Sequence, residues 1–222
     1  MRAGAAQDQN ARQPNPLAWR GESLCQRRVA NYYPDSFVDG EGVRCSLYVS
    51  GCPFKCEGCF NAATWSFRYG TEYTDELQDR ILTDLSRPWV QGLSLLGGEP
   101  MLATPILLPL LRAFRKRFGA ARDVWCWTGY RFEELIGSGH KDKLELLGLI
   151  DVLVDGRFEI AQKAANLAFR GSRNQRILRV PASLAAGRAV EYGAAYLSDN
   201  ESNAALQTTQ AAADSTRNRW AV

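Results

Sequence analysis

Residues 51–61 read Gly-Cys-Pro-Phe-Lys-Cys-Glu-Gly-Cys-Phe-Asn and place three cysteines at the spacing Cys-x3-Cys-x2-Cys. Three soft thiolates this close together can hold three corners of a cubane [4Fe–4S] cluster. The stretch contains no fourth cysteine, so the fourth iron would be open to a small-molecule ligand. The spacing therefore predicts a reactive cluster with Cys52, Cys56 and Cys59 as its metal ligands.

Other uses of these cysteines fit the sequence less well. A structural zinc site takes four ligands, usually as two close pairs or with histidines, but the only histidine is His140 and there is no second close pair of cysteines. A disulfide framework requires an oxidising compartment, which nothing in the sequence indicates. A four-cysteine ferredoxin cluster could recruit Cys25, Cys45 or Cys126, although their separations match neither common ferredoxin spacing. We expect Cys25 to be incidental, Cys45 to pack as a small hydrophobe and His140 to be solvated.

The composition is that of an ordinary globular protein. A chain of 222 residues with 45% apolar and 23% charged residues suits one domain with tails. The net charge of +3 is too small and too evenly spread to indicate nucleic acid. Residues 1–13 lack the apolar segment of a signal peptide, and the longest apolar run, 101–111, is too short to span a bilayer. We therefore predict a cytoplasmic protein with no nucleic-acid or membrane partner.

Three regions of the chain differ in composition. Residues 1–27 are rich in Ala, Gln, Asn, Arg and Pro and have no helical or strand period, which predicts a disordered arm. Residues 28–180 form the predicted core. Residues 181–222 turn to Ala, Ser, Thr, Asn and Gln and are predicted to be a mobile or marginally helical tail, although its aromatic residues leave open that part of it docks.

Strands and helices alternate through the core. Predicted strands cover 43–50, 92–96, 123–128, 151–154 and 176–180, and predicted helices cover 75–86, 104 to near 119, 134–136 and 141–149. This alternation indicates βαβ units and a parallel sheet. A full eightfold barrel takes about 250 residues, so the shorter core predicts an α/β fold with a partial, open barrel. Active sites in such sheets lie at the carboxyl ends of strands, so the cysteine loop and the turn Gly97-Gly98-Glu99-Pro100 should face the same site.

The cysteine motif resembles that of radical S-adenosylmethionine (SAM) enzymes. Longer stretches resemble one family among them, the activating proteins of anaerobic ribonucleoside-triphosphate reductases. The similar stretches lie in order between about residues 29 and 180, and both tails depart from the family. These stretches are 32–34, 44–47, 60–61 with 64–65, 94–100, 125–130, 152–156 and 170–172 with 174–175.

The resemblance implies a radical activating enzyme. SAM would bind the open iron and be cleaved by an electron from the cluster, and a glycyl radical would form on the large subunit of the reductase. A low-potential donor such as a flavodoxin would supply the electron. Gly97 and Gly98 would let the backbone approach the methionine end of SAM, and Glu99 would accept a charge-assisted hydrogen bond from its ammonium group.

The same resemblance implies an adenine contact by Gly58 and Phe60, which flank Cys59. Two other substrates stay open: a glycyl-radical enzyme of the formate-lyase type, or a small molecule. The short core leaves little room to enclose a substrate beyond SAM, which favours a protein substrate that brings its own bulk. Segments 125–130, 152–156 and 170–175 carry the narrower resemblance to the reductase-activating family.

Overall fold

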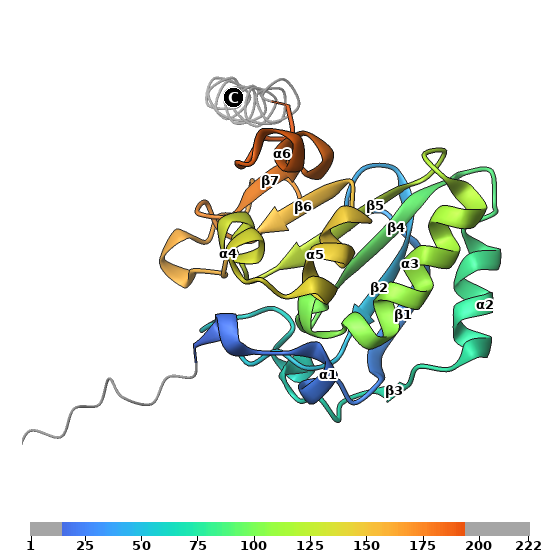
Figure 1. Ribbon diagram of the computed structural model, residues 1–222, viewed down its shortest axis with the longest axis horizontal. Coiled ribbons are helices and arrows are strands. Elements are labelled where there is room, and N and C mark those ends of the chain that lie inside the picture. Colours follow the sequence, from blue (N-terminus) through green and yellow to red (C-terminus); the bar gives the residue numbers. More distant parts are fainter. Residues whose placement is uncertain (1–14, 194–222) are drawn as a thin grey trace, which may run out of the picture.

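The centre of the molecule is a seven-stranded sheet (Figure 1). The computed structural model describes residues 15–193. Within them the strands run in the spatial order β3-β1-β2-β4-β5-β6-β7. They are β1 (Arg28–Ser36), β2 (Val43–Val49), β3 (Thr71–Glu72), β4 (Val90–Gly97), β5 (Asp123–Thr128), β6 (Val152–Asp155) and β7 (Arg176–Arg179).

Strands β2, β4, β5 and β6 are parallel neighbours and form the middle of the sheet. Antiparallel strands complete it on both sides: β1 and β3 beyond β2, and β7 beyond β6. Because β3 and β7 do not pair with each other, the sheet stays open. The predicted α/β fold with a partial, open arrangement of parallel strands is confirmed.

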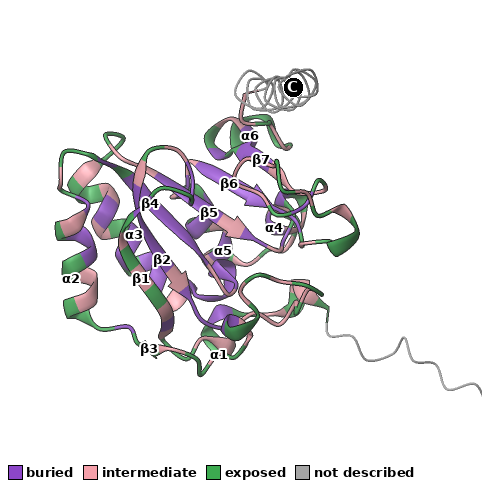
Figure 2. Ribbon diagram, turned by 180° about the vertical axis from the view of Figure 1, so that it is seen from behind, coloured by how far each residue is buried: buried purple, intermediate pink, exposed green. Residues whose placement is uncertain are grey.

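Helices lie against one face of this sheet (Figure 1). The view from behind looks directly onto the strands of the same sheet (Figure 2). The alternation along β2 explains this arrangement. Cys45, Leu47 and Val49 point into the main hydrophobic core, whereas Arg44 lies on the opposite face beside Trp125. Cys45 is fully buried, as predicted. The helices are α2 (Asp75–Asp84), α3 (Thr104–Phe118), α4 (Phe132–Gly137), α5 (Lys141–Gly148) and α6 (Val180–Ala186).

The ends of the helices follow from local sequence chemistry. The Thr74 hydroxyl accepts a hydrogen bond from the Leu77 amide at 3.3 Å and caps α2. Helix α3 stops where Gly119 adopts a φ of 54°. The predicted helices 75–86, 104–119 and 141–149 therefore agree with the observed ones to within about two residues. Strand β1 begins at Arg28 and was not predicted as a strand.

The prediction of a disordered arm is wrong for residues 15–27. This segment contains the turn η2 (Pro16–Ala18) and the short helix α1 (Gly21–Leu24), because side chains of the core satisfy its backbone carbonyls. At the other end, the ordered chain continues past residue 180 through α6, and Tyr192 packs against Trp125. Residues 1–14 and 194–222 lie outside the described part, so the predictions made for them stay predictions.

Between residues 15 and 193, none of the helices combines the length and the apolar character needed to cross a bilayer.

Candidate active site

The ends of β2 and β4 meet through two backbone hydrogen bonds. Gly98 N–H donates to the Val49 carbonyl and Glu99 N–H donates to the Gly51 carbonyl, each at 2.8 Å. A side chain at Gly98 would put its Cβ 2.6 Å from the Gly51 carbonyl oxygen. Gly97 has a φ of +101°, which favours glycine. The packing of these two neighbouring strand ends thus requires both glycines. This is a second reason for them, besides the close approach of a ligand that the sequence predicted.

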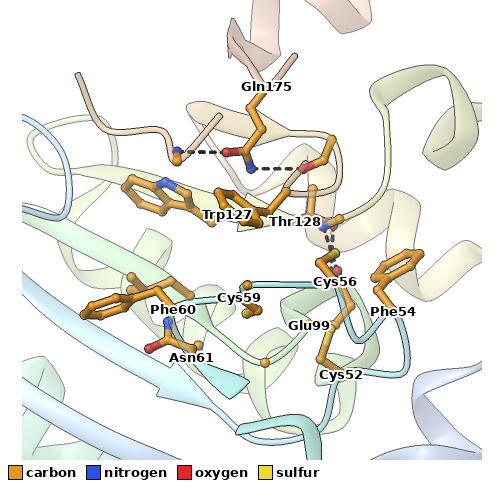
Figure 3. Close-up of a pocket in the computed structure, with 18 of the residues that line it drawn as sticks. Cys52, Phe54, Cys56, Cys59, Phe60, Asn61, Glu99, Trp127, Thr128 and Gln175 are labelled. Atoms are coloured by element: carbon orange, nitrogen blue, oxygen red, sulfur yellow. Dashed lines mark hydrogen bonds between the residues drawn. The ribbon is translucent and has the colours of Figure 1, made fainter. Parts of the chain in front are cut away.

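A cavity of about 430 Å³ opens at this edge of the sheet. The cysteine loop lines one side of it, and the loops that follow β5, β6 and η5 (Ile160–Gln162) line the other (Figure 3). All the predicted site residues border this cavity: Cys52, Cys56, Gly58, Cys59, Phe60, Gly97, Gly98 and Glu99. The structure therefore brings together the two motifs that the sequence placed at the same edge.

The cysteine loop is folded by its own backbone and by the turn η3 (Ala62–Trp65). Gly51 N–H donates to the Thr64 carbonyl at 2.8 Å, Cys52 N–H to the Trp65 carbonyl at 3.0 Å, and Cys59 N–H to the Cys56 carbonyl at 3.1 Å. Three soft thiols consequently face one cavity, which is the donor set that an iron–sulfur cluster takes. Within residues 15–193, no three candidate ligands converge closely enough to hold a single metal ion.

Burial makes two thiols of this loop, those of Cys52 and Cys56, weaker acids in the metal-free protein. It raises the pKa of Cys52 to about 12, with a further rise from the Glu99 carboxylate and opposition from the backbone N–H groups of Phe54 and Lys55. Burial also raises the pKa of Cys56, whereas a backbone hydrogen bond from Phe158 lowers it. Thiolate ligands must lose their protons, so binding of iron here releases protons.

Glu99 is fully buried and joins the end of β4 to the end of β5. Its Oε1 accepts from the Met101 amide at 2.9 Å and from the Thr128 hydroxyl at 2.7 Å, and its Oε2 accepts from the Gly129 amide at 2.8 Å. Burial raises the pKa of Glu99 to about 7, and these hydrogen bonds and the charge of Lys143 act against that rise. Glu99 therefore has a structural function that the sequence did not predict, and it still borders the cavity.

Several cavity residues were not assigned to the site from the sequence. The end of β5 and the residue after it contribute Trp127, Thr128 and Gly129. The residue directly after β6 is Gly156, which also lines the cavity. The rule that places sites at the carboxyl ends of parallel strands was the signal that could have found them. Gln175 completes this wall: its Oε1 accepts from the Gly171 amide at 2.9 Å and its Nε2 donates to the Gly156 carbonyl at 3.0 Å (Figure 3).

The other candidate residues stand apart from the cavity wall. Cys45 and Cys126 are fully buried in the main core, and Cys25 packs against that core in the N-terminal segment. His140 is half-buried, and its Nε2 lies 2.6 Å from the Leu17 carbonyl oxygen, so the expectation of a solvated histidine is wrong.

Comparison with known proteins agrees with this geometry. Residues 38–178 match the model of the "4Fe-4S single cluster domain" family. The anaerobic ribonucleoside-triphosphate reductase-activating protein of Haemophilus influenzae is 42% identical over 152 residues, which cover 67% of this chain and 95% of that protein. The chain belongs to this family of activating proteins. The family member from Escherichia coli K12 is 40% identical over 148 residues, covering 65% of this chain and 93% of its own length. The member from enterobacteria phage T4 is 39% identical over 147 residues, covering 65% and 89%.

Proposed function

We propose that this protein is a radical SAM activating enzyme that generates a glycyl radical on the large subunit of an anaerobic ribonucleoside-triphosphate reductase. One observation carries the proposal: the three cysteines and the Gly97-Gly98-Glu99 turn border the same cavity, which is open at the edge of the sheet. The names of its relatives point to the same reductase as the protein substrate.

Each site residue has a proposed task. Cys52, Cys56 and Cys59 would hold three irons of a [4Fe–4S] cluster, which leaves the fourth iron for the amino and carboxylate groups of SAM. Gly97 and Gly98 would present backbone to the methionine end of SAM.

Three further residues complete the proposed SAM site. The Glu99 carboxylate, fixed by its three hydrogen-bond donors, has an acceptor position left for the ammonium group of SAM. Gly58 and Phe60 would border the adenine. Phe60 is 97% exposed at the rim of the cavity, as a residue that also meets a protein substrate would be.

When bound, the reduced cluster supplies an electron to SAM, which yields methionine and 5′-deoxyadenosine once a hydrogen atom has been taken from a glycine of the reductase. The chain's own contribution is to bind and orient SAM and to keep the cavity open toward the protein substrate. A low-potential donor such as a flavodoxin is the electron source that this chemistry needs.

The test mixes the reduced, reconstituted protein with SAM and the large anaerobic reductase and records EPR spectra. We expect a glycyl-radical doublet on the reductase, with 5′-deoxyadenosine formed alongside it. Cys59→Ala is the matched control and should give neither product. A doublet with a formate-lyase-type enzyme and none with the reductase would move the assignment to that partner. SAM cleavage without a doublet on either protein would favour a small-molecule substrate, and bound iron without SAM cleavage would indicate an electron-transfer protein.

A further inference from the structure

The N-terminal segment 15–25 is tied to the body of the protein by its backbone. Three of its carbonyl oxygens, those of Pro16, Leu17 and Trp19, each face a polar side chain from the α4–α5 region. The pairs are Tyr130 Oη with Pro16 at 2.9 Å, His140 Nε2 with Leu17 at 2.6 Å and Lys143 Nζ with Trp19 at 2.7 Å. A carbonyl oxygen can only accept, so all three side chains donate.

Lys143 makes this attachment strong. Its side chain is fully buried, which is rare for lysine unless its charge is compensated. The ammonium group lies 4.5 Å from the centre of the Tyr130 ring and 3.2 Å from its hydroxyl, in addition to the Trp19 carbonyl. The segment therefore helps to bury Lys143, and its departure would break the hydrogen bond from Lys143 to the Trp19 carbonyl.

The segment contacts the cysteine loop through one aromatic pair. Trp19 meets Phe54 edge-on, with ring centres 5.1 Å apart. Phe54 is half-buried and has three further neighbours. Its ring lies 5.0 Å from that of Tyr130 and 4.7 Å from the Arg157 guanidinium, and a Cβ on Gly129 would come within 2.6 Å of it. Phe54 thus anchors the loop, and Trp19 is one of the residues that hold the Phe54 ring in place.

The position of Phe54 matters for Cys52. Phe54 and Lys55 lie between the proposed cluster ligands Cys52 and Cys56 in the chain, so their backbone conformation sets where those two thiols lie relative to each other. Lys55 has a φ of 48°, a conformation that a residue with a side chain adopts only when its neighbours hold it there. The placement of the Cys52 and Cys56 thiols therefore depends on the anchoring of Phe54.

We propose that residues 15–25 form a strap that positions the cysteine loop, with Trp19 as the positioning residue that holds Phe54 and, through it, the backbone between Cys52 and Cys56. The strap precedes residues 38–178, the part that matches the family model, so it is an addition to the matched domain. The proposal rests on the proposed function only in taking this loop as the cluster site.

The first experiment measures hydrogen exchange of residues 50–60 in the full-length, metal-free protein. Trp19→Ala should speed exchange in this segment about tenfold, the size expected for one aromatic edge contact with its buried area. Trp19→Phe keeps an aromatic edge and should restore most of the protection. The matched control is Trp89→Ala, since Trp89 is 57% exposed at the opposite end of β4 and should leave the segment unchanged. Should Trp19→Ala fail to fold, Phe54→Leu removes the other half of the same contact, together with the contacts to Tyr130 and Arg157, and should speed exchange at least as much.

The second experiment reconstitutes the cluster and records the EPR spectrum of its reduced form. Trp19→Ala should change the line shape, and Trp19→Phe should return it toward that of the unchanged protein. Exchange that stays unchanged in Trp19→Ala, or that rises equally in the strands of the core, would overturn the strap as a positioning device. So would a loss of protection in Trp19→Phe as large as in Trp19→Ala. The metal-free measurement needs neither SAM nor a partner, so a failure of the proposed function would leave it interpretable.

Discussion

Cys52, Cys56 and Cys59 are each expected to be indispensable for iron binding. Changing any one of them to alanine should abolish the cluster, because two thiolates leave too few ligands for it. Iron analysis after anaerobic reconstitution provides the measurement, with about four irons per chain expected for the unchanged protein. Cys25→Ala is the control and should retain full iron content, since Cys25 packs against the core away from the cavity wall. Loss of iron in Cys25→Ala would mean that the count of three ligands is wrong.

Glu99 should make the stability of the metal-free protein depend on pH. Its folded-state pKa of about 7 lies above its ordinary value of 4.5. Between these two values the folded state keeps a proton that the unfolded state has released, so stability falls as pH rises from about 4.5 to about 7. This difference in pKa corresponds to a loss of folding stability of roughly 3 kcal/mol at most.

Glu99→Gln removes this titration and should flatten the pH dependence in that window. The change also sets an NH₂ group among the backbone N–H donors that the carboxylate accepts from, so we expect a loss of about 1–3 kcal/mol at low pH. Urea unfolding at pH 5 and pH 8 measures both effects. An equal loss of stability with rising pH in the variant and the unchanged protein would show that other groups cause it.

At the scale of the elements, Asp155 joins the end of β6 to β7 and to the start of α4. Its Oδ2 accepts from the Phe132 amide at the start of α4 at 2.7 Å and from Arg176 Nη2 on β7 at 2.5 Å. The Asp155 side chain is only 1% exposed and that of Arg176 is 29% exposed, so a buried carboxylate pairs with a partly buried arginine and also accepts the hydrogen bond at the helix end. Asp155 thus ties the last antiparallel strand, β7, and the start of helix α4 to the end of β6.

Asp155→Ala should lower the free energy of unfolding by about 3 kcal/mol, because it leaves a partly buried arginine and a buried N–H without their acceptor. Glu133→Ala is the matched control. Glu133 binds the same arginine at 2.8 Å but is 51% exposed, so its loss should cost less than about 1 kcal/mol. If denaturant unfolding gave equal losses in the free energy of unfolding for the two variants, burial of Asp155 would not be the cause of its larger predicted effect.

Two elements show which parts of the fold the local sequence can predict and which it cannot. The helix 75–86 was predicted because its start is written locally, in a threonine cap followed by two acidic residues. Strand β1 was not predicted, since it contains Pro34 and its register is interrupted by two bulges opposite β2. β1 pairs with the next strand of the chain, β2, but its sequence lacks the regular alternation of apolar and polar residues that predicts a strand.

For the whole molecule, removal of iron should leave the fold intact. Cys52, Cys56 and Cys59 lie in one loop, and the main core is formed by the helices and the sheet without these three residues. We expect the chelated protein to keep its far-UV circular dichroism and its cooperative unfolding, with faster hydrogen exchange confined to residues 51–66. This behaviour contrasts with that of small zinc domains, which unfold without metal. Loss of cooperative unfolding on chelation would contradict the prediction.

The sequence by itself determined the chemistry of the site. Cys52, Cys56 and Cys59 stand within eight residues, so their spacing alone limited the group they can bind. The alternation of strands and helices similarly determined the edge of the sheet to which the Gly97-Gly98-Glu99 turn belongs. These features are local in the chain or follow from the rules of parallel sheets, and for that reason they can be read without coordinates.

Only the tertiary structure decided which distant residues complete that site. Thr128 and Gly129 bind the carboxylate of Glu99 from about thirty residues away, and Gln175 closes the far wall of the cavity. Residues 15–25 have the composition of a disordered arm, yet Lys143 and Tyr130 satisfy their carbonyls. Composition reports how much apolar surface a segment can bury by itself, whereas its order depends on partners that the rest of the fold brings to it.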